Sequence, residues 1–298
     1  MYYFLLFLTS MLWAGNFVAG KFLVGHTDHI TLIIIRWGIA VIVLLPFLLW
    51  KEKTLRFQRK HFWLLVGMGA TGIALFNFFM FLALEYTSAD NVGLISTLNP
   101  ISIAIFSFFI MKDRLSARQL SAMIVSFFGI LVVLTNGHLN RLLTLEANIG
   151  DIYMLLAVVS WGLYSVLGKK VMSELSPLVT TFWAGVFGNI LVLPFLLDGV
   201  QFSHITASFW IASLYTGIGA TVLGMVFWNI GVQKVGSTKS GMFLNFNPIF
   251  TAILAYFLLG ETMTTGQIIG AFVVIVGVYF FTTKRAYSFA KLAPKKAS

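Results

Sequence analysis

The sequence contains no cysteine and few charged side chains. Of its 298 residues only 10% are charged, whereas a soluble domain carries about 25%. Without cysteine, the chain can form no disulfide framework, thiolate zinc site, iron–sulfur cluster or cysteine nucleophile. So few charges cannot cover a surface that faces water, which excludes a soluble globular protein. The same low polarity excludes a disordered chain.

The sequence consists largely of long apolar runs. Hydrophobic residues make up 59% of the chain, and mean hydropathy is +0.92. About 20 apolar residues cross the roughly 30 Å hydrocarbon layer as a helix. The connections are too short to hold a soluble domain, and the first run has no cleavage site of a signal peptide. The sequence therefore predicts an all-α membrane protein with ten transmembrane helices, at 3–24, 30–49, 62–84, 91–111, 119–136, 150–172, 178–197, 208–232, 237–259 and 265–283.

Lysine and arginine are distributed unevenly between the two ends of these spans. Seventeen of the 20 lie at the loops after spans 2, 4, 6 and 8 or in the C-terminal tail, and one, Arg141, lies on the opposite side. We call the richer end the basic side. Positively charged loops stay in the cytoplasm, so we expect a multi-pass protein of the cell membrane with both termini cytoplasmic. The net charge of +10 then indicates contact with anionic lipid headgroups and not with nucleic acid.

The two halves of the chain align without a gap at an offset of 148 residues. Matched positions include Trp13 with Trp161, Gly20-Lys21 with Gly168-Lys169, Asn99-Pro100-Ile101 with Asn247-Pro248-Ile249, and Gln119 with Gln267. We therefore divide the chain into a first five-helix repeat (1–148), a second (149–285) and a basic cytoplasmic tail (286–298). Because each repeat has an odd number of spans, the two must be inverted in the membrane. Inverted repeats are typical of secondary transporters, which use them for alternating access.

Several motifs also resemble those of a known family. Leu12–Lys21 resembles the first-helix signature of EamA-type proteins, and Ile35–Ala40 resembles their second-helix Arg-aromatic-x-x-Ala motif. Asn99-Pro100 through Gln119 resembles their Pro…Glu…Gln block, which recurs at Asn247-Pro248 through Gln267. Asp113 stands where the family usually has Glu, at an expected helix boundary. The resemblance identifies a ten-helix member of the drug/metabolite transporter superfamily, and it implies export or exchange of small metabolites through a central cavity.

The two Asn-Pro pairs are the first candidates for a transport site. Pro100 and Pro248 lie near the middle of their spans, where each removes a backbone donor and should free a carbonyl, at Ser96 and Leu244. Paired interruptions at matching positions of two repeats indicate a binding site, so we expect hinges at both prolines. Substrate-binding amides are expected at Asn99, Asn245 and Asn247. A packing kink is the alternative.

Polar and aromatic residues in the middle of other spans are further candidates. Trp13 and Asn16 share one helix face, as do their counterparts Trp161 and Tyr164. Tryptophans usually anchor at the interface, so these mid-span positions favour an amphipathic or aromatic ligand. Trp228, with the adjacent Asn229, and Asn77 are similar. Packing within an aromatic core is the alternative.

Charge within the spans indicates which ligand the protein binds. Arg36 lies about 9 Å into its span at 1.5 Å per residue, and a cation at that depth requires an anion or carbonyls. Glu85 and Asp90 are the nearest candidate partners of Arg36, and a substrate carboxylate or phosphate is the alternative. Lys239 could bind the same substrate anion from the inner side, whereas Lys21 more readily extends to the interface. No Asp or Glu lies mid-span. A proton-coupled exporter of cations commonly has such a carboxylate, so we favour neutral, zwitterionic or anionic metabolites such as amino acids.

Other functions are weaker alternatives. They are a multidrug or organic-cation efflux carrier, an integral membrane transferase and a channel. The His26-x-Asp28-His29 cluster is short, and there is no Walker-type phosphate loop, so we expect a non-enzyme without metal, cofactor or ATP. Gly266 and Gly270 form a Gly-x-x-x-Gly motif, which can mark a dimer face or close packing within the bundle. We expect a monomer or weak homodimer.

Overall fold

The computed structural model describes residues 1–20, 22–23, 26–87, 89–138, 140, 148–196, 199, 202–203, 205–260 and 262–283. Over these residues the chain is all-helical, in ten helical segments that match the ten predicted spans. Eight of them are long and apolar enough to cross a membrane. The predicted cytoplasmic tail 286–298 lies outside the described residues.

The first repeat contributes five of these segments. They are α1 (Tyr2–Gly20), α2 (His29–Lys51), a third built from η1 (Arg59–His61), α3 (Phe62–Met68), η2 (Gly69–Leu75) and α4 (Phe76–Tyr86), a fourth built from α5 (Ala89–Ser96) and α6 (Asn99–Met111), and α7 (Ala117–Leu134).

The second repeat follows the same plan. Its segments are α8 (Ile149–Val171), α9 (Pro177–Val192) with η4 (Leu193–Phe195), a third built from α10 (Ala207–Leu214), η5 (Tyr215–Leu223) and α11 (Gly224–Val235), a fourth built from α12 (Ser237–Gly241), η6 (Met242–Phe246) and α13 (Asn247–Leu259), and α14 (Thr265–Thr282).

The repeat extends to the start of the fifth helix of each half. Ser116 accepts a hydrogen bond from the Gln119 amide at 3.3 Å before α7, and Thr264 accepts one from the Gln267 amide at 3.2 Å before α14. In both cases the glutamine side chain bonds back to the capping residue. These are capping boxes, which satisfy backbone donors at a helix start. The matched glutamines therefore act in local structure, and nothing in these contacts involves a ligand.

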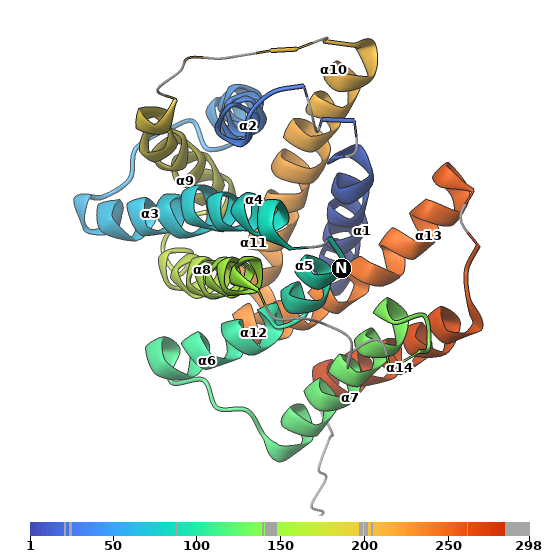
Figure 1. Ribbon diagram of the computed structural model, residues 1–298. Helices are drawn as coiled ribbons and strands as arrows, with labels where there is room; N and C mark the ends of the chain where they lie inside the picture. Colours follow the sequence, from blue (N-terminus) through green and yellow to red (C-terminus); the bar gives the residue numbers. More distant parts are fainter. Residues whose placement is uncertain are drawn as a thin grey trace, which may run out of the picture.

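The packing of the helices is related by the inverted symmetry. In the first repeat α1 packs against α11 and α13, and in the second α8 packs between α4 and α6 (Figure 1). Likewise α2 packs on η5 and α9 packs on η2. Each contact thus has an equivalent in which both elements are replaced by their counterparts in the other repeat, 148 residues away in the sequence. The two repeats therefore interlock, since the first helix of each is held between the third and fourth helices of the other.

Helices α7 and α14 form a closely packed pair at one side of the bundle (Figure 1). A Cβ atom on Gly129 would lie 2.7 Å from the Val274 nitrogen, and one on Gly277 would lie 2.7 Å from the Ser126 nitrogen. Gly266 and Gly270 likewise face the backbone of the segment from Gly129 to Gly137. The Gly-x-x-x-Gly motif therefore packs within the chain, and the alternative that it forms a dimer face is wrong.

Contacts between connections fall into two groups. On the predicted basic side, Lys60 and His61 meet Glu174. Facing the other way, the Ser203 amide donates to the His26 carbonyl at 2.9 Å. The first contact joins the connections after spans 2 and 6, and the second joins those after spans 1 and 7. If the chain crosses the membrane ten times, connections after even-numbered spans lie on one side and those after odd-numbered spans on the other, and both contacts agree with this arrangement. The cytoplasmic placement of the termini stays a prediction.

Both fourth spans are interrupted immediately before their Asn-Pro pair. The first has a turn at Thr97–Leu98 between α5 and α6, and the second has the 3-10 segment η6 before α13. Pro100 thus occupies a helix start, where its missing N–H costs nothing. The expectation of a free carbonyl at Leu244 is wrong, because the tightened turn lets that carbonyl accept the Asn247 amide.

Candidate functional site

Five aromatic rings from both repeats meet where the two halves interlock. Trp13 of α1 lies with its ring centroid 5.2 Å from that of Trp161 of α8 and 5.5 Å from that of Trp228 of α11. Trp161 also contacts Trp228 at 5.7 Å, Tyr164 at 5.1 Å and Phe76 of α4 at 5.2 Å. We call these five residues the aromatic cluster. Trp161, Tyr164 and Trp228 are buried.

The indole nitrogens of the aromatic cluster differ in their hydrogen bonding. Trp13 Nε1 donates to the Ala220 carbonyl at 2.8 Å. The buried Nε1 atoms of Trp161 and Trp228 have no acceptor among the described residues. A buried donor without an acceptor costs about 1–3 kcal/mol. The cluster therefore presents two indole donors that an acceptor on a bound molecule, or a water, would satisfy.

The far edge of the cluster is fixed by a buried polar network. Asn229 Nδ2 donates to Tyr164 Oη at 3.0 Å and to Thr181 Oγ1 at 2.8 Å. On its other side the Tyr164 ring presses against Gly72, where a Cβ atom would clash with the ring. Tyr164 is thereby held in one position, and its ring in turn stacks on Trp161. Its role as a direct substrate contact is less favoured, because its hydroxyl already has a partner.

The third span of each repeat contains a π-helical stretch at the level of the cluster. These stretches are η2 in the first repeat and η5 in the second. They lie at matching positions, because adding the 148-residue offset to the residue numbers of η2 places it within η5. A π-helical turn widens the helix, releases carbonyls from the regular pattern and is frequent at functional sites. The Trp13 indole bonds to Ala220 within η5. The next residue, Thr221, accepts a hydrogen bond from Arg36.

Arg36 is anchored on η5 through a neutral partner. Its Nε donates to Thr221 Oγ1 at 2.6 Å, and that hydroxyl donates to the Thr216 carbonyl at 2.7 Å. Among the described ion pairs none involves Arg36. Glu85, which the sequence suggested as its charge partner, instead pairs with His29 at 3.1 Å. The terminal guanidinium nitrogens of Arg36 thus lack a carboxylate partner within the described part of the chain.

Four of the predicted asparagines also carry unsatisfied amide oxygens. The buried Oδ1 atoms of Asn16, Asn99, Asn245 and Asn247 have no hydrogen-bond partner among the described residues. Asn245 does donate through Nδ2 to Ser126 at 2.8 Å. Asn77 is different, because its Nδ2 donates to the Ile73 carbonyl of η2 at 2.7 Å. Asn99 and Asn247 each stand at the first position of a helix, beside Pro100 and Pro248.

The structure does not join every predicted residue to this site. Lys239 is half-buried in α12, and Lys21 lies outside the described residues. Sequence reasoning missed Phe76, Thr221, Ala220 and Thr181. Of these, Phe76 could not be recognised in a chain with 30 phenylalanines. The π-helical carbonyls leave no signature in sequence. Asn229 was noted beside Trp228, but its bond to Tyr164 depends on the packing of α8 against α11.

Comparison with known proteins matches this chain to one family. The profile of the EamA-like transporter family matches residues 1–135 and 148–283, once in each repeat. The two matches are separated by residues 136–147.

Individual relatives agree with this family. The chain is 33% identical over 273 residues to the uncharacterized transporter YyaM of Bacillus subtilis, covering 90% of this chain and 89% of that protein. It is 28% identical to an uncharacterized transporter of Archaeoglobus fulgidus, covering 94% and 97%. A crystal structure with 20% identity superposes with a TM-score of 0.78 over 94% of this chain and 95% of the other. At that identity the similarity shows the fold alone.

Proposed function

The chain belongs to the EamA-like transporter family, and we propose that this membrane transporter exports or exchanges small zwitterionic or anionic metabolites, such as amino acids, by alternating access. Two interlocked inverted repeats around one central site support this mechanism, because such repeats can exchange conformations. In this view the substrate binds at the aromatic cluster, and no ATP is used.

The main support for a substrate with an anionic group is the pair of buried indole donors. Trp161 and Trp228 Nε1 have no acceptor among the described residues, and their rings lie 5.7 Å apart. A carboxylate has two oxygens and can accept a hydrogen bond from each of two neighbouring donors. Hydrogen bonds to a charged group contribute about 1.5–3 kcal/mol each, which offsets the cost of leaving both indoles unsatisfied in the empty state.

Arg36 also supports a substrate with an anionic group. It is bonded to Thr221, which follows directly after the Ala220 carbonyl that holds Trp13. The guanidinium and the aromatic cluster are therefore connected through two successive residues of η5. An intramembrane arginine without an acidic partner is costly unless a ligand anion or carbonyls accept its donors. The amide oxygens of Asn99 and Asn247 are acceptors that suit a substrate ammonium group.

Counterflow in proteoliposomes tests this function. Vesicles are loaded in turn with aromatic amino acids, aliphatic amino acids, nucleosides, phosphorylated sugars and one organic cation, and uptake of the labelled compound is followed without ATP. We expect saturable exchange of a carboxylate- or phosphate-bearing class. Exchange of the organic cation alone would overturn the assignment of an anionic group and favour the multidrug alternative. Linear, unsaturable flux would instead favour a channel.

A further inference from the structure

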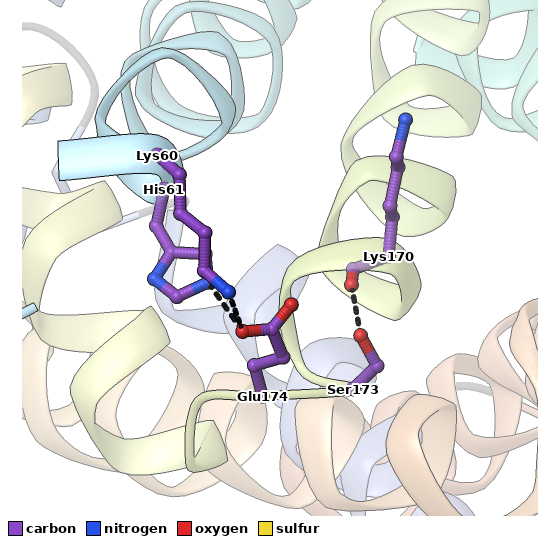
Figure 2. A network of polar contacts seen from close by, with 5 residues as sticks. All are labelled: Lys60, His61, Lys170, Ser173 and Glu174. Carbon is purple, nitrogen blue, oxygen red and sulfur yellow. Dashed lines mark hydrogen bonds and ion pairs between the residues drawn. The ribbon is translucent and has the colours of Figure 1, made fainter. Parts of the chain in front are cut away.

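An ion-pair cluster on the basic side ties the two repeats together away from the aromatic cluster. Glu174 lies in the connection between α8 and α9, and its carboxylate pairs with Lys60 and with His61 Nε2, the latter at 3.3 Å (Figure 2). Lys60 and His61 belong to η1, in the first repeat. We call these three residues the basic-side latch. Since Glu174 belongs to the second repeat, separation of the repeats on this side breaks both pairs.

The three groups of the latch differ in exposure. The side chains of Lys60 and Glu174 are half-exposed, at 54% and 51%, whereas that of His61 is only 5% exposed. Both ring nitrogens of His61 are buried and have no hydrogen-bond partner among the described residues, although Nε2 lies 3.3 Å from a Glu174 carboxylate oxygen. The contact counts as an ion pair only when the ring is protonated, so the attraction between His61 and Glu174 depends on the proton.

The other charged groups nearby do not replace His61 in this role. Within η1 the neighbouring Arg59 is exposed. Helices α3 and α9 have no titratable side chain. At the end of α8, Lys169 donates to the Gln233 carbonyl at 2.7 Å, and the Lys170 ammonium points away from Glu174 (Figure 2). Lys51 is the last residue of α2, and Glu52 follows it at the start of the connection that leads to η1.

We propose that His61 is a proton-binding site through which pH on the basic side controls opening of the transporter on that side. With the imidazole protonated, Glu174 holds two cations and the repeats are held together. With the imidazole neutral, only Lys60 remains as a cationic partner and the basic side opens more readily. This inference rests on the proposed alternating access, but it does not depend on the substrate.

The direction of the effect follows from the charges. Imidazole changes charge between about pH 5 and 8. The hydrogen bond from Lys60 holds the pKa of Glu174 below its ordinary value, and His61 adds to that shift. Because the lowered pKa belongs to the closed state, stabilisation from Glu174 is present above the ordinary carboxylate pKa and is lost only as pH falls through the lowered one. Between about pH 5.5 and 8 the carboxylate stays ionised while an imidazole changes charge, so acid favours the closed basic side.

Labelling of a single introduced cysteine measures this opening without any substrate. The chain has no cysteine, and Thr180 in the first turns of α9 is fully buried with an unbonded hydroxyl. Two proteins are reacted with a maleimide from about pH 5.5 to 8: the single variant Thr180→Cys and the double variant Thr180→Cys with His61→Gln. At each pH the labelling rate of the double variant is divided by that of the single variant, which cancels the pH dependence of the thiol itself. We expect His61→Gln to speed labelling about threefold at the acid end and to have little effect at pH 8.

Two further variants complete the test. Glu174→Gln, at a half-exposed position, should abolish the same pH dependence without disturbing the core. His138→Gln, an exposed histidine on the opposite side, should leave the profile unchanged. A rate ratio that is constant with pH, or an unaltered profile in Glu174→Gln, would overturn the proton-binding role. If counterflow finds no substrate while the labelling still depends on His61, the latch stands and only the proposed substrate class fails.

Discussion

At the scale of single residues, two tryptophans at matching positions of the repeats have different environments. Trp13 and Trp161 occupy matching positions of the two repeats, yet only Trp13 has an acceptor, the Ala220 carbonyl. The reason lies one helical turn beyond Ala220, at the start of α11. Gly224 leaves room for the Trp13 indole, whereas its counterpart in the first repeat is Phe76, whose ring contacts Trp161. The repeat is therefore asymmetric at its centre, and of these two matched indoles only that of Trp161 lacks an acceptor among the described residues.

Replacement of Trp161 by phenylalanine tests that donor. Trp161→Phe keeps an aromatic ring and removes the N–H, so the half-saturation concentration of a carboxylate substrate in counterflow should rise about tenfold, the equivalent of one charge-assisted hydrogen bond. Trp13→Phe is the matched control, because its N–H is used within the protein. That variant should lower thermal stability and leave substrate preference unchanged. Equal affinities in wild type and Trp161→Phe would show that the donor faces no substrate group.

A second prediction at this scale concerns Arg36. Arg36→Gln retains a donor for the Thr221 hydroxyl but removes the charge, so transport efficiency for anionic or zwitterionic substrates should fall by at least about tenfold. The protein should still insert, as checked by its elution as a single species in detergent. Thr221→Val is the comparison, since it frees Arg36 without removing its charge. Normal transport in Arg36→Gln would assign Arg36 a structural role.

At the scale of elements, the two π-helical stretches position the site. Each third span changes from α- to π-helix at the level of the aromatic cluster, and each stretch packs against the second helix of the opposite repeat. The widened turns bring backbone groups to Trp13 and bring the Cα of Gly72 against the Tyr164 ring. An ordinary α-helix would use its carbonyls internally.

The contact between η2 and α8 predicts a large effect of one methyl group. In Gly72→Ala the new Cβ would overlap the Tyr164 ring, and overpacking of this kind costs about 1–3 kcal/mol. The melting temperature in detergent should fall, and transport should fall with it because Trp161 stacks on Tyr164. Adding Tyr164→Leu should recover stability but not transport. A Gly72→Ala variant as stable as wild type would contradict the packing described here.

At the scale of the whole molecule, the inverted repeats are joined by different contacts on the two sides of the membrane. On the basic side Ser107 of α6 lies against Ser237 of α12, with the two hydroxyl oxygens 2.7 Å apart. The latch at Glu174 and the bond from Trp183 Nε1 to the Leu55 carbonyl, at 2.8 Å, join the repeats at the same end. In the proposed alternating access, these contacts separate during each cycle.

A disulfide across this end should therefore stop the cycle. In the chain free of native cysteine, Ser107→Cys with Ser237→Cys places two thiols at positions whose hydroxyls already touch, close enough for a disulfide. Oxidation should abolish most counterflow, and a reductant should restore it. Each single variant, treated with the same oxidant, should keep its activity. Full transport by the cross-linked protein would show that the repeats do not separate here.

The sequence by itself determined the ten spans, the duplication and its inversion, because span length and the odd number of spans are fixed by the bilayer. It also singled out Trp13, Trp161, Trp228 and Arg36 as candidates, since mid-span tryptophans and an arginine within a span stand out against apolar runs. Tertiary structure alone decided which of them are satisfied. The partner of Arg36 proved to be Thr221, 185 residues away, and Glu85 bonded elsewhere. Such pairings depend on helix packing and on π-helical turns, whose geometry arises from contacts between repeats and has no local sequence pattern.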